Sequence, residues 1–267
     1  MKTLRTVLFL ATIAVVLLDG YLITTGDISG WSALLLLVCI ELPLFGVLLS
    51  LSWIESRKRG VPLVSLMPPL AFVTYEIHAW SDLSKLLRKV TQSPPGATEF
   101  TSRTGVWQLP CMFSVAVVIE IVVVDYLIPW TWLRLVLLVL SLYPLGLLWG
   151  TIAAKVVYPH YLQAREQELV LRRGREIVIE VPLSNISQIA CHRGFCASEH
   201  EIERDSLRLG GSSGTNVHVK LHSPRDAVHG RWPWQPPRSS LVSELDFFVD
   251  QPVIAVQAIE AARTAQP

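Results

Sequence analysis

QLPCMFSVAVVIEIVVVDYLIP (residues 108–129) and WLRLVLLVLSLYPLGLLWGTIAA (residues 132–154) are two almost uninterrupted apolar stretches. Two more lie upstream, at residues 7–24 and 31–53. A helix needs about 20 predominantly apolar residues to cross hydrocarbon about 30 Å thick, and all four stretches meet or approach that length. The sequence therefore predicts four transmembrane helices.

The composition divides the chain into two parts. Hydrophobic residues make up 51% of the chain and charged residues 17%, which is unlike an ordinary soluble domain. The apolar residues concentrate before Lys155, and the rest has the composition of a globular domain. We therefore expect a transmembrane domain at residues 1–154 and a soluble domain at 155–267. The net charge of +1 gives no indication of a nucleic-acid partner.

The basic residues that precede or follow the predicted spans lie on one side of them: Lys2, Arg5, Arg57, Lys58, Arg59 and Lys155. The connections on the other side, residues 25–30 and 129–131, contain no Lys or Arg. Because positive residues stay in the cytoplasm, this pattern predicts a multi-pass protein with both termini, the 55–107 loop and the soluble domain cytoplasmic. The first stretch also resembles a signal peptide, but residues 19–21 offer no small-residue cleavage site, which favours an uncleaved helix.

The 55–107 loop contains an amphipathic segment at residues 72–90. Its apolar residues recur at helical spacing, with basic residues between them. This pattern predicts a helix that lies in the membrane interface or one that packs on the cytoplasmic domain.

Acidic residues inside the predicted spans are candidate functional groups. Glu41 and Glu120 each lie about ten residues from the outer end of their span, so we expect them at similar depth. Carboxyls at that depth can relay protons or hold a cation, and they can equally serve structural pairing. Asp125 and Arg134 flank the tight turn between the last two spans and are expected to pair.

The soluble part changes to a period of two. Apolar and polar residues alternate at 176–181, 215–221 and 244–249, as in strands with one buried face. LVLRRGR at 169–175 is a strand that runs into a glycine turn, so a hairpin follows. Further strands are expected at 158–164, 186–192 and 205–209. Residues 252–265 are expected to form a helix with Asp250 at its cap.

Four motifs in this part carry a resemblance to a known family: LVLRRGR (169–175), VPLSNI (181–186), GTNV (214–217) and FFVDQP (247–252). Over residues 158–262 the chain resembles the bacterial pleckstrin-homology-like (PH-like) domains found beside transmembrane helices. The resemblance implies an all-β PH-like barrel with a C-terminal helix, and hence an α+β membrane protein in which a four-helix transmembrane domain precedes that barrel. It also implies a binding scaffold rather than an enzyme, without a cofactor, in the inner membrane.

Two surface features are candidate contacts for lipid or a partner. Arg172, Arg173 and Arg175 cluster at the hairpin turn, where they either touch anionic lipid or form a solvated tip. Trp232 and Trp234 lie in the Pro-rich stretch RWPWQPPR, where they either dock a partner or pack back on the domain.

Other chemical motifs are weak. Cys191, His192, Cys196 and His200 lack the two separated knuckles of a zinc site, so we expect a buried Cys and an exposed His rather than a metal. G-x-S-x-G occurs once, as GGSSG at 210–214, a glycine-rich stretch expected to be a flexible hairpin, and neither H-E-x-x-H nor G-x-G-x-x-G occurs.

The hypothesis is therefore a membrane scaffold or regulator whose PH-like domain binds a protein partner or the membrane surface. The alternative is a small proton- or cation-coupled transport component that uses Glu41 and Glu120. A lipid-modifying enzyme has only the intramembrane carboxyls in its support.

Overall fold

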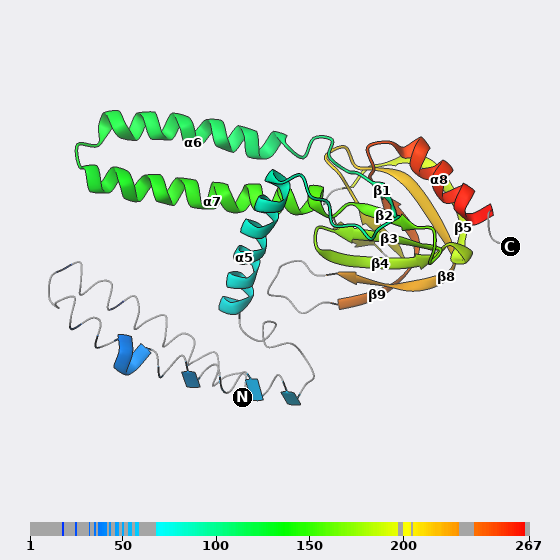
Figure 1. The fold of residues 1–267 in the computed structure, drawn as a ribbon, viewed down its shortest axis with the longest axis horizontal. Coiled ribbons are helices and arrows are strands. Elements are labelled where there is room, and N and C mark those ends of the chain that lie inside the picture. Colours follow the sequence, from blue (N-terminus) through cyan, green and yellow to red (C-terminus); the bar gives the residue numbers. More distant parts are fainter. Residues whose placement is uncertain are drawn as a thin grey trace. The chain divides into compact units, whose positions relative to one another are not determined.

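The computed structural model describes residues 68–196, 200–203, 205–229 and 238–264, together with isolated positions between 18 and 58 (Figure 1). The chain forms two compact units, Met1–Val73 with Trp232–Gln235, and Thr74–Arg231 with Pro236–Pro267. The helices of the second unit are α5 (Pro68–Leu87, from Thr74 onward), α6 (Gln108–Leu127), α7 (Thr131–Val157) and α8 (Pro252–Thr264). Its strands are β1 (Thr98–Phe100), β2 (His160–Gln163), β3 (Glu168–Arg173), β4 (Glu176–Pro182), β5 (Ile186–Gly194), β6 (His200–Glu203), β7 (Ser206–Leu209), β8 (Thr215–His229) and β9 (Arg238–Phe247).

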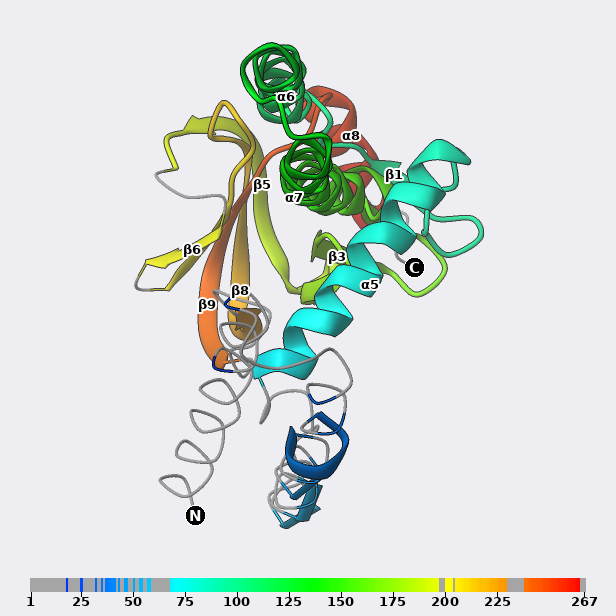
Figure 2. The same ribbon diagram turned by 90° about the vertical axis from the view of Figure 1, so that its left-hand side faces the viewer.

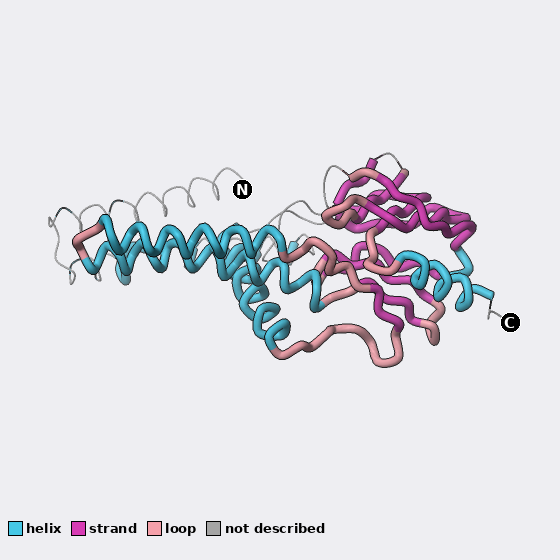
Figure 3. The backbone as a smooth tube through the Cα atoms, turned by 90° about the horizontal axis from the view of Figure 1, so that it is seen from above, coloured by secondary structure: helices cyan, strands magenta, loops and turns pink. Residues whose placement is uncertain are grey.

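Helices α6 and α7 form an antiparallel hairpin that projects from the sheets (Figures 1 and 3). Polar pairs join the two helices at three levels. Trp149 Nε1 donates to Ser114 Oγ at 3.1 Å, and Ser141 Oγ donates to Glu120 Oε1 at 2.8 Å. Near the turn, the Arg134 guanidinium lies 2.5 Å from an Asp125 carboxylate oxygen, so the predicted pair is confirmed. The apolar side chains of the hairpin lie mostly on its outside.

The prediction of a four-helix transmembrane domain is wrong. Within the described residues, only α6 and α7 are long and apolar enough to cross a membrane, and they match the predicted spans 108–129 and 132–154. Apart from Leu18, the stretch 7–24 lies outside the described residues, and so does most of 31–53. A run of apolar residues gives a length but not a continuous α-helix. In the second stretch the described positions include a π-helical turn, η1 (Leu37–Glu41), ahead of Pro43, whose ring and missing N–H disturb a regular helix.

The β region consists of two sheets rather than one barrel that follows the membrane part. The first sheet has the order β1-β2-β3-β4, and the second has the order β5-β8-β9-β7-β6. Neighbouring strands are antiparallel except for the parallel pair β7–β9. Side chains from both sheets and from α8 fill a common core, including Leu169, Leu171, Ile179, Leu245, Phe247 and Ile259.

One strand of the first sheet precedes the α6–α7 hairpin in the sequence. Strand β1 comes from the segment between α5 and α6, and it pairs with β2, which follows α7. The α6–α7 hairpin is therefore inserted between two neighbouring strands of one sheet. A strand of three residues is too short to reveal itself by alternation, which explains why the sequence did not predict it.

The predicted hairpin and C-terminal helix are confirmed. Strands β3 and β4 pair around Gly174, whose φ of +56° suits glycine. Helix α8 covers residues 252–264 as expected, but Asp250 does not cap it. Its carboxylate accepts hydrogen bonds from the backbone N–H groups of Arg103 and Thr104 and from the Thr101 hydroxyl. Burial alone would raise the pKa of Asp250, but these bonds outweigh it and hold the pKa below its usual value.

Candidate functional site at the junction of helices and sheets

Helix α5 crosses α7 near the end at which α7 enters the sheets (Figures 1 and 2). Two glycines of α7 make the crossing close. A Cβ on Gly150 would lie 2.5 Å from the backbone oxygen of Ala79, and a Cβ on Gly146 would lie 2.3 Å from the Trp80 ring. Small residues at this spacing allow two helix backbones to approach each other. The Tyr143 hydroxyl also donates a hydrogen bond to Glu76.

The residues of α7 that α5 contacts show which way each face of α5 points. Glu76 and Trp80 contact α7 at residues 143 and 146, toward the free end of the hairpin. Helical spacing places Ile77, Leu83 and Leu87 beside Trp80, and we call these four residues the outer face of α5. The inner face consists of His78, Asp82 and Lys85. Asp82 and Lys85 contact Arg175 and Tyr158 through their side chains, and His78 contacts Arg175 through its backbone oxygen while its ring is exposed.

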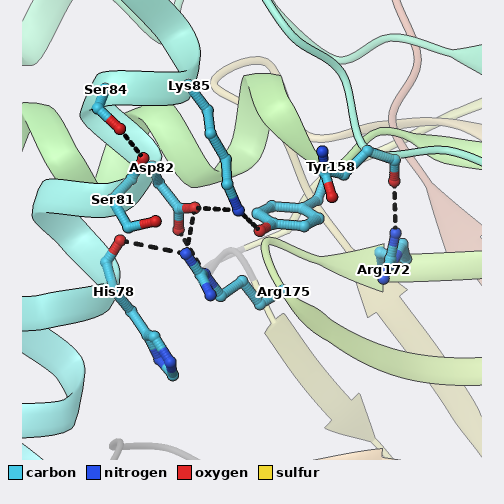
Figure 4. A network of polar contacts seen from close by, with 9 residues as sticks. His78, Ser81, Asp82, Ser84, Lys85, Tyr158, Arg172 and Arg175 are labelled. Atoms are coloured by element: carbon cyan, nitrogen blue, oxygen red, sulfur yellow. Dashed lines mark hydrogen bonds and ion pairs between the residues drawn. The ribbon is translucent and has the colours of Figure 1, made fainter.

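Asp82 is the centre of the inner face. Its side chain is buried, and it accepts two hydrogen bonds from the Arg175 guanidinium, from Nε at 2.8 Å and from an Nη at 2.6 Å (Figure 4). Lys85 Nζ lies 3.7 Å from the same carboxylate and donates to the Tyr158 hydroxyl at 2.8 Å. The bond to Asp82 raises the pKa of Arg175 further, so the guanidinium stays charged.

Three positively charged side chains lie close to the ring of Tyr158. It follows the last residue of α7, and only Pro159 separates it from β2. The charged groups of Arg172, Lys85 and Arg175 lie 5.2, 5.3 and 5.5 Å from the centre of its ring. An aromatic face attracts cations at such distances. Arg172 also donates to the backbone oxygen of Gln92 at 2.9 Å. The junction therefore fastens α5, the end of α7 and the β3–β4 turn to one another without a flexible linker.

The structure separates the three arginines of the predicted cluster. Arg172 and Arg175 take part in the junction, so neither belongs to a freely solvated tip. Arg173 lies elsewhere, with its guanidinium 2.9 Å from Nδ1 of His200 on β6. Trp232 and Trp234 lie outside the described residues.

Of the two predicted intramembrane carboxyls, the structure describes the side chain of Glu120 but not that of Glu41. Glu120 lies in α6 and pairs with Ser141 of α7, as described above. Glu41 belongs to the π-helical turn, and its side chain lies outside the described residues. The proposed proton or cation role of this pair therefore stays a prediction.

Sequence reasoning did not single out Asp82 or Tyr158. The one available signal was that Asp82 is the sole acidic residue between Glu76 and Glu99 and lies in a basic amphipathic helix. Its partner Arg175 is 93 residues away in the sequence, so no local pattern could connect them.

A buried histidine lies next to the junction. His160 of β2 is buried, and its Nδ1 accepts the backbone N–H of Arg172 at 3.0 Å. Burial lowers the pKa of His160 to about 4, so the ring is neutral at physiological pH. Protonation of Nδ1 would also remove the acceptor of that bond.

The described residues give no support to a metal site. They contain no group of three or more His, Cys, Asp or Glu side chains that could hold an ion. Cys191 is exposed, which corrects the expectation of a buried Cys, and the His192 ring lies beside that of His218 at 6.1 Å. A shallow groove of about 560 Å³ runs between β4 and the β8–β9 ladder, and its lining includes Ile177, Ile179, Glu180, Pro224 and Leu241.

Comparison with known proteins adds no relative. No family model, no curated protein and no solved structure matches this chain.

Proposed function

We propose that this chain is a non-catalytic binding protein anchored in the inner membrane, with the α6–α7 hairpin in the bilayer. The sheets would be held at the cytoplasmic surface, where they bind a protein partner or the membrane surface. The observation that carries the proposal is that the apolar side chains of α6 and α7 lie on the outside of the hairpin. Only 6% and 11% of the most apolar windows of α6 and α7 are buried within the protein. A core helix of a soluble protein would be buried, so hydrocarbon is the solvent that suits these helices.

The charges support a cytoplasmic location for the sheets and both termini. Arg103 precedes α6 and Lys155 lies in the last turn of α7, both at the open end of the hairpin. At the other end, Arg134 is neutralised by Asp125. Positive residues favour the cytoplasmic side, and the basic residues near the N-terminus agree.

The resemblance to PH-like domains supports a binding role. Domains of that kind are recognition scaffolds, and the groove between β4 and β8–β9 is a candidate contact surface with exposed apolar residues such as Leu241. The junction gives this surface a defined orientation, since α7 passes into β2 with no linker.

Anchoring is tested on the full-length chain in its own membrane. Carbonate at high pH removes peripheral proteins, and we expect this chain to stay in the membrane pellet until detergent is added. Release by carbonate would contradict the anchor. Binding is tested with a photo-crosslinking residue at Leu241, with Arg165 outside the groove as the control. A discrete protein or lipid adduct at 241 and none at 165 supports the proposal, and equal labelling at both contradicts it.

Transport remains the second candidate, because Glu120 is an ionisable group in a helix that suits the bilayer. Glu120→Gln keeps an acceptor for the Ser141 hydroxyl but cannot exchange a proton. A transport role predicts loss of cation or proton flux in vesicles that contain this variant. A structural role predicts unchanged stability and no flux in either protein.

A further inference from the structure

The outer face of α5 is largely exposed within the described residues, apart from the half-buried Leu83 and the edge of Trp80 that rests on Gly146. Ile77, Trp80 and Leu87 are 60%, 44% and 76% exposed, although all three are large and apolar. The opposite face of the same helix is engaged through Ala79 and Asp82, both buried. Helix α5 is therefore amphipathic. Its polar inner face packs on the protein through Asp82, and its apolar outer face is largely exposed.

The orientation of α5 matches the plane of a membrane surface. The helix runs across the hairpin rather than along it, at the level where the hairpin leaves the sheets (Figures 1 and 2). Its outer face looks toward the free end of the hairpin, as the contacts of Glu76 with Tyr143 and of Trp80 with Gly146 establish. That direction is the one in which the exposed apolar surface of α6 and α7 continues.

We propose that α5 lies in the headgroup region of the cytoplasmic leaflet, with Ile77, Trp80, Leu83 and Leu87 in contact with lipid. This inference rests on the proposed insertion of the hairpin. An amphipathic helix binds a bilayer in this way when its apolar side faces the acyl chains and basic residues lie at the headgroups. Trp80 is suited to the interface, and Arg88 and Lys89 follow the helix at its exposed end.

The occupant of the outer face is therefore a lipid leaflet rather than a protein. Two observations favour lipid. The outer face is continuous with the lipid-compatible surface of α7, since Trp80 rests on Gly146 of that helix. On the inner face, which would be available to water on a free interfacial helix, Asp82 is buried and bonded to Arg175. The helix then serves as a stop that sets the depth of the hairpin and the tilt of the sheets.

The test places spin labels on the full chain in vesicles that contain anionic lipid. In a background with the four native cysteines replaced by Ser, single cysteines are introduced as Leu87→Cys, His78→Cys and Leu140→Cys. Leu87 represents the outer face, His78 the inner face, and Leu140 the middle of α7, where it is 66% exposed. Collision with oxygen, which dissolves in lipid, is compared with collision with a water-soluble nickel chelate.

We expect the label at 140 to collide with oxygen and not with nickel, and the label at 87 to favour oxygen at least threefold more than the label at 78. Strong nickel collision at 87 with a lipid-buried 140 would overturn the inference and leave the anchor intact. Protection of 87 from both reagents would mean a protein cover and would also overturn it. Nickel collision at 140 would instead overturn the proposed insertion itself.

Discussion

The hairpin and the sheets of this protein place their polar and apolar residues in opposite ways. In the sheets, side chains such as Leu169 and Phe247 are fully buried in a common core. In the hairpin, the polar residues meet between the helices, as Glu120 does with Ser141, while the apolar residues form the outside. The difference shows that the two regions bury opposite kinds of side chain, as the proposed membrane anchor requires, with Tyr158 and its neighbours where the regions meet.

The largest effect is expected when charge is placed on the outside of the hairpin. Val118 and Val122 are 60% and 64% exposed, and the double variant Val118→Arg/Val122→Arg should lose membrane integration. Each Arg near the centre of a span costs about 2.5–3.5 kcal/mol of insertion free energy. The measurement is the fraction that resists carbonate extraction.

The matched control carries the same charges on the sheet side. Leu241 and Ile254 are 60% and 57% exposed, and Leu241→Arg/Ile254→Arg should leave carbonate resistance unchanged because these positions face water. Equal loss in the two double variants would remove the distinction between the two regions.

A smaller effect is expected at the boundary. Arg175→Gln leaves Asp82, which is 1% exposed, with only Lys85 as a nearby cation. Loss of one partner of a buried ion pair costs about 3 kcal/mol of unfolding free energy. The measurement is denaturant unfolding of the detergent-solubilised protein, followed by tryptophan fluorescence.

Arg173→Gln is the control at the same turn. Its guanidinium lies against His200 and takes no part in the Asp82 network, so the change should cost less than about 1 kcal/mol. The two arginines have the same charge and are two residues apart. A similar loss for both would show that the turn needs only positive charge and not the pair with Asp82.

The smallest effect is a pH dependence within the sheets. His160 has a folded-state pKa of about 4 against an ordinary value of 6.5. The unfolded chain therefore binds a proton more readily, and stability falls as pH drops below 6.5, by about 2 kcal/mol at pH 5. His160→Asn keeps an acceptor for the Arg172 N–H and cannot be protonated, so its stability should fall less between pH 7 and 5. An unchanged slope in this variant would mean that other groups carry the pH dependence.

The sequence was informative where a pattern is long or local. The two spans of the hairpin follow from apolar runs of about 20 residues, and the β3–β4 turn follows from Gly174 between two alternating strands. Asp125 and Arg134 could be paired because nine residues and a tight turn separate them. These features depend on neighbours in the sequence.

The sequence did not predict features that depend on contacts between residues far apart in the chain. Helix α5 was expected either at the membrane or on the soluble domain, and the structure gives it one packed face and one open face because Arg175 reaches Asp82. Strand β1 exists because β2 offers it an edge, and its three residues carry no pattern of their own. The π-helical turn before Pro43 likewise has no signal in the length of its apolar stretch.

The most direct test of the membrane-anchored arrangement is the sidedness of the two ends of the hairpin in intact cells. A cysteine at Trp130, in the turn between α6 and α7, and the native exposed Cys191 in the sheets are treated separately with a membrane-impermeant maleimide. The arrangement predicts labelling at 130 in intact cells and labelling at 191 only after the membrane is opened. Labelling of both positions from the same side of a sealed membrane would contradict it.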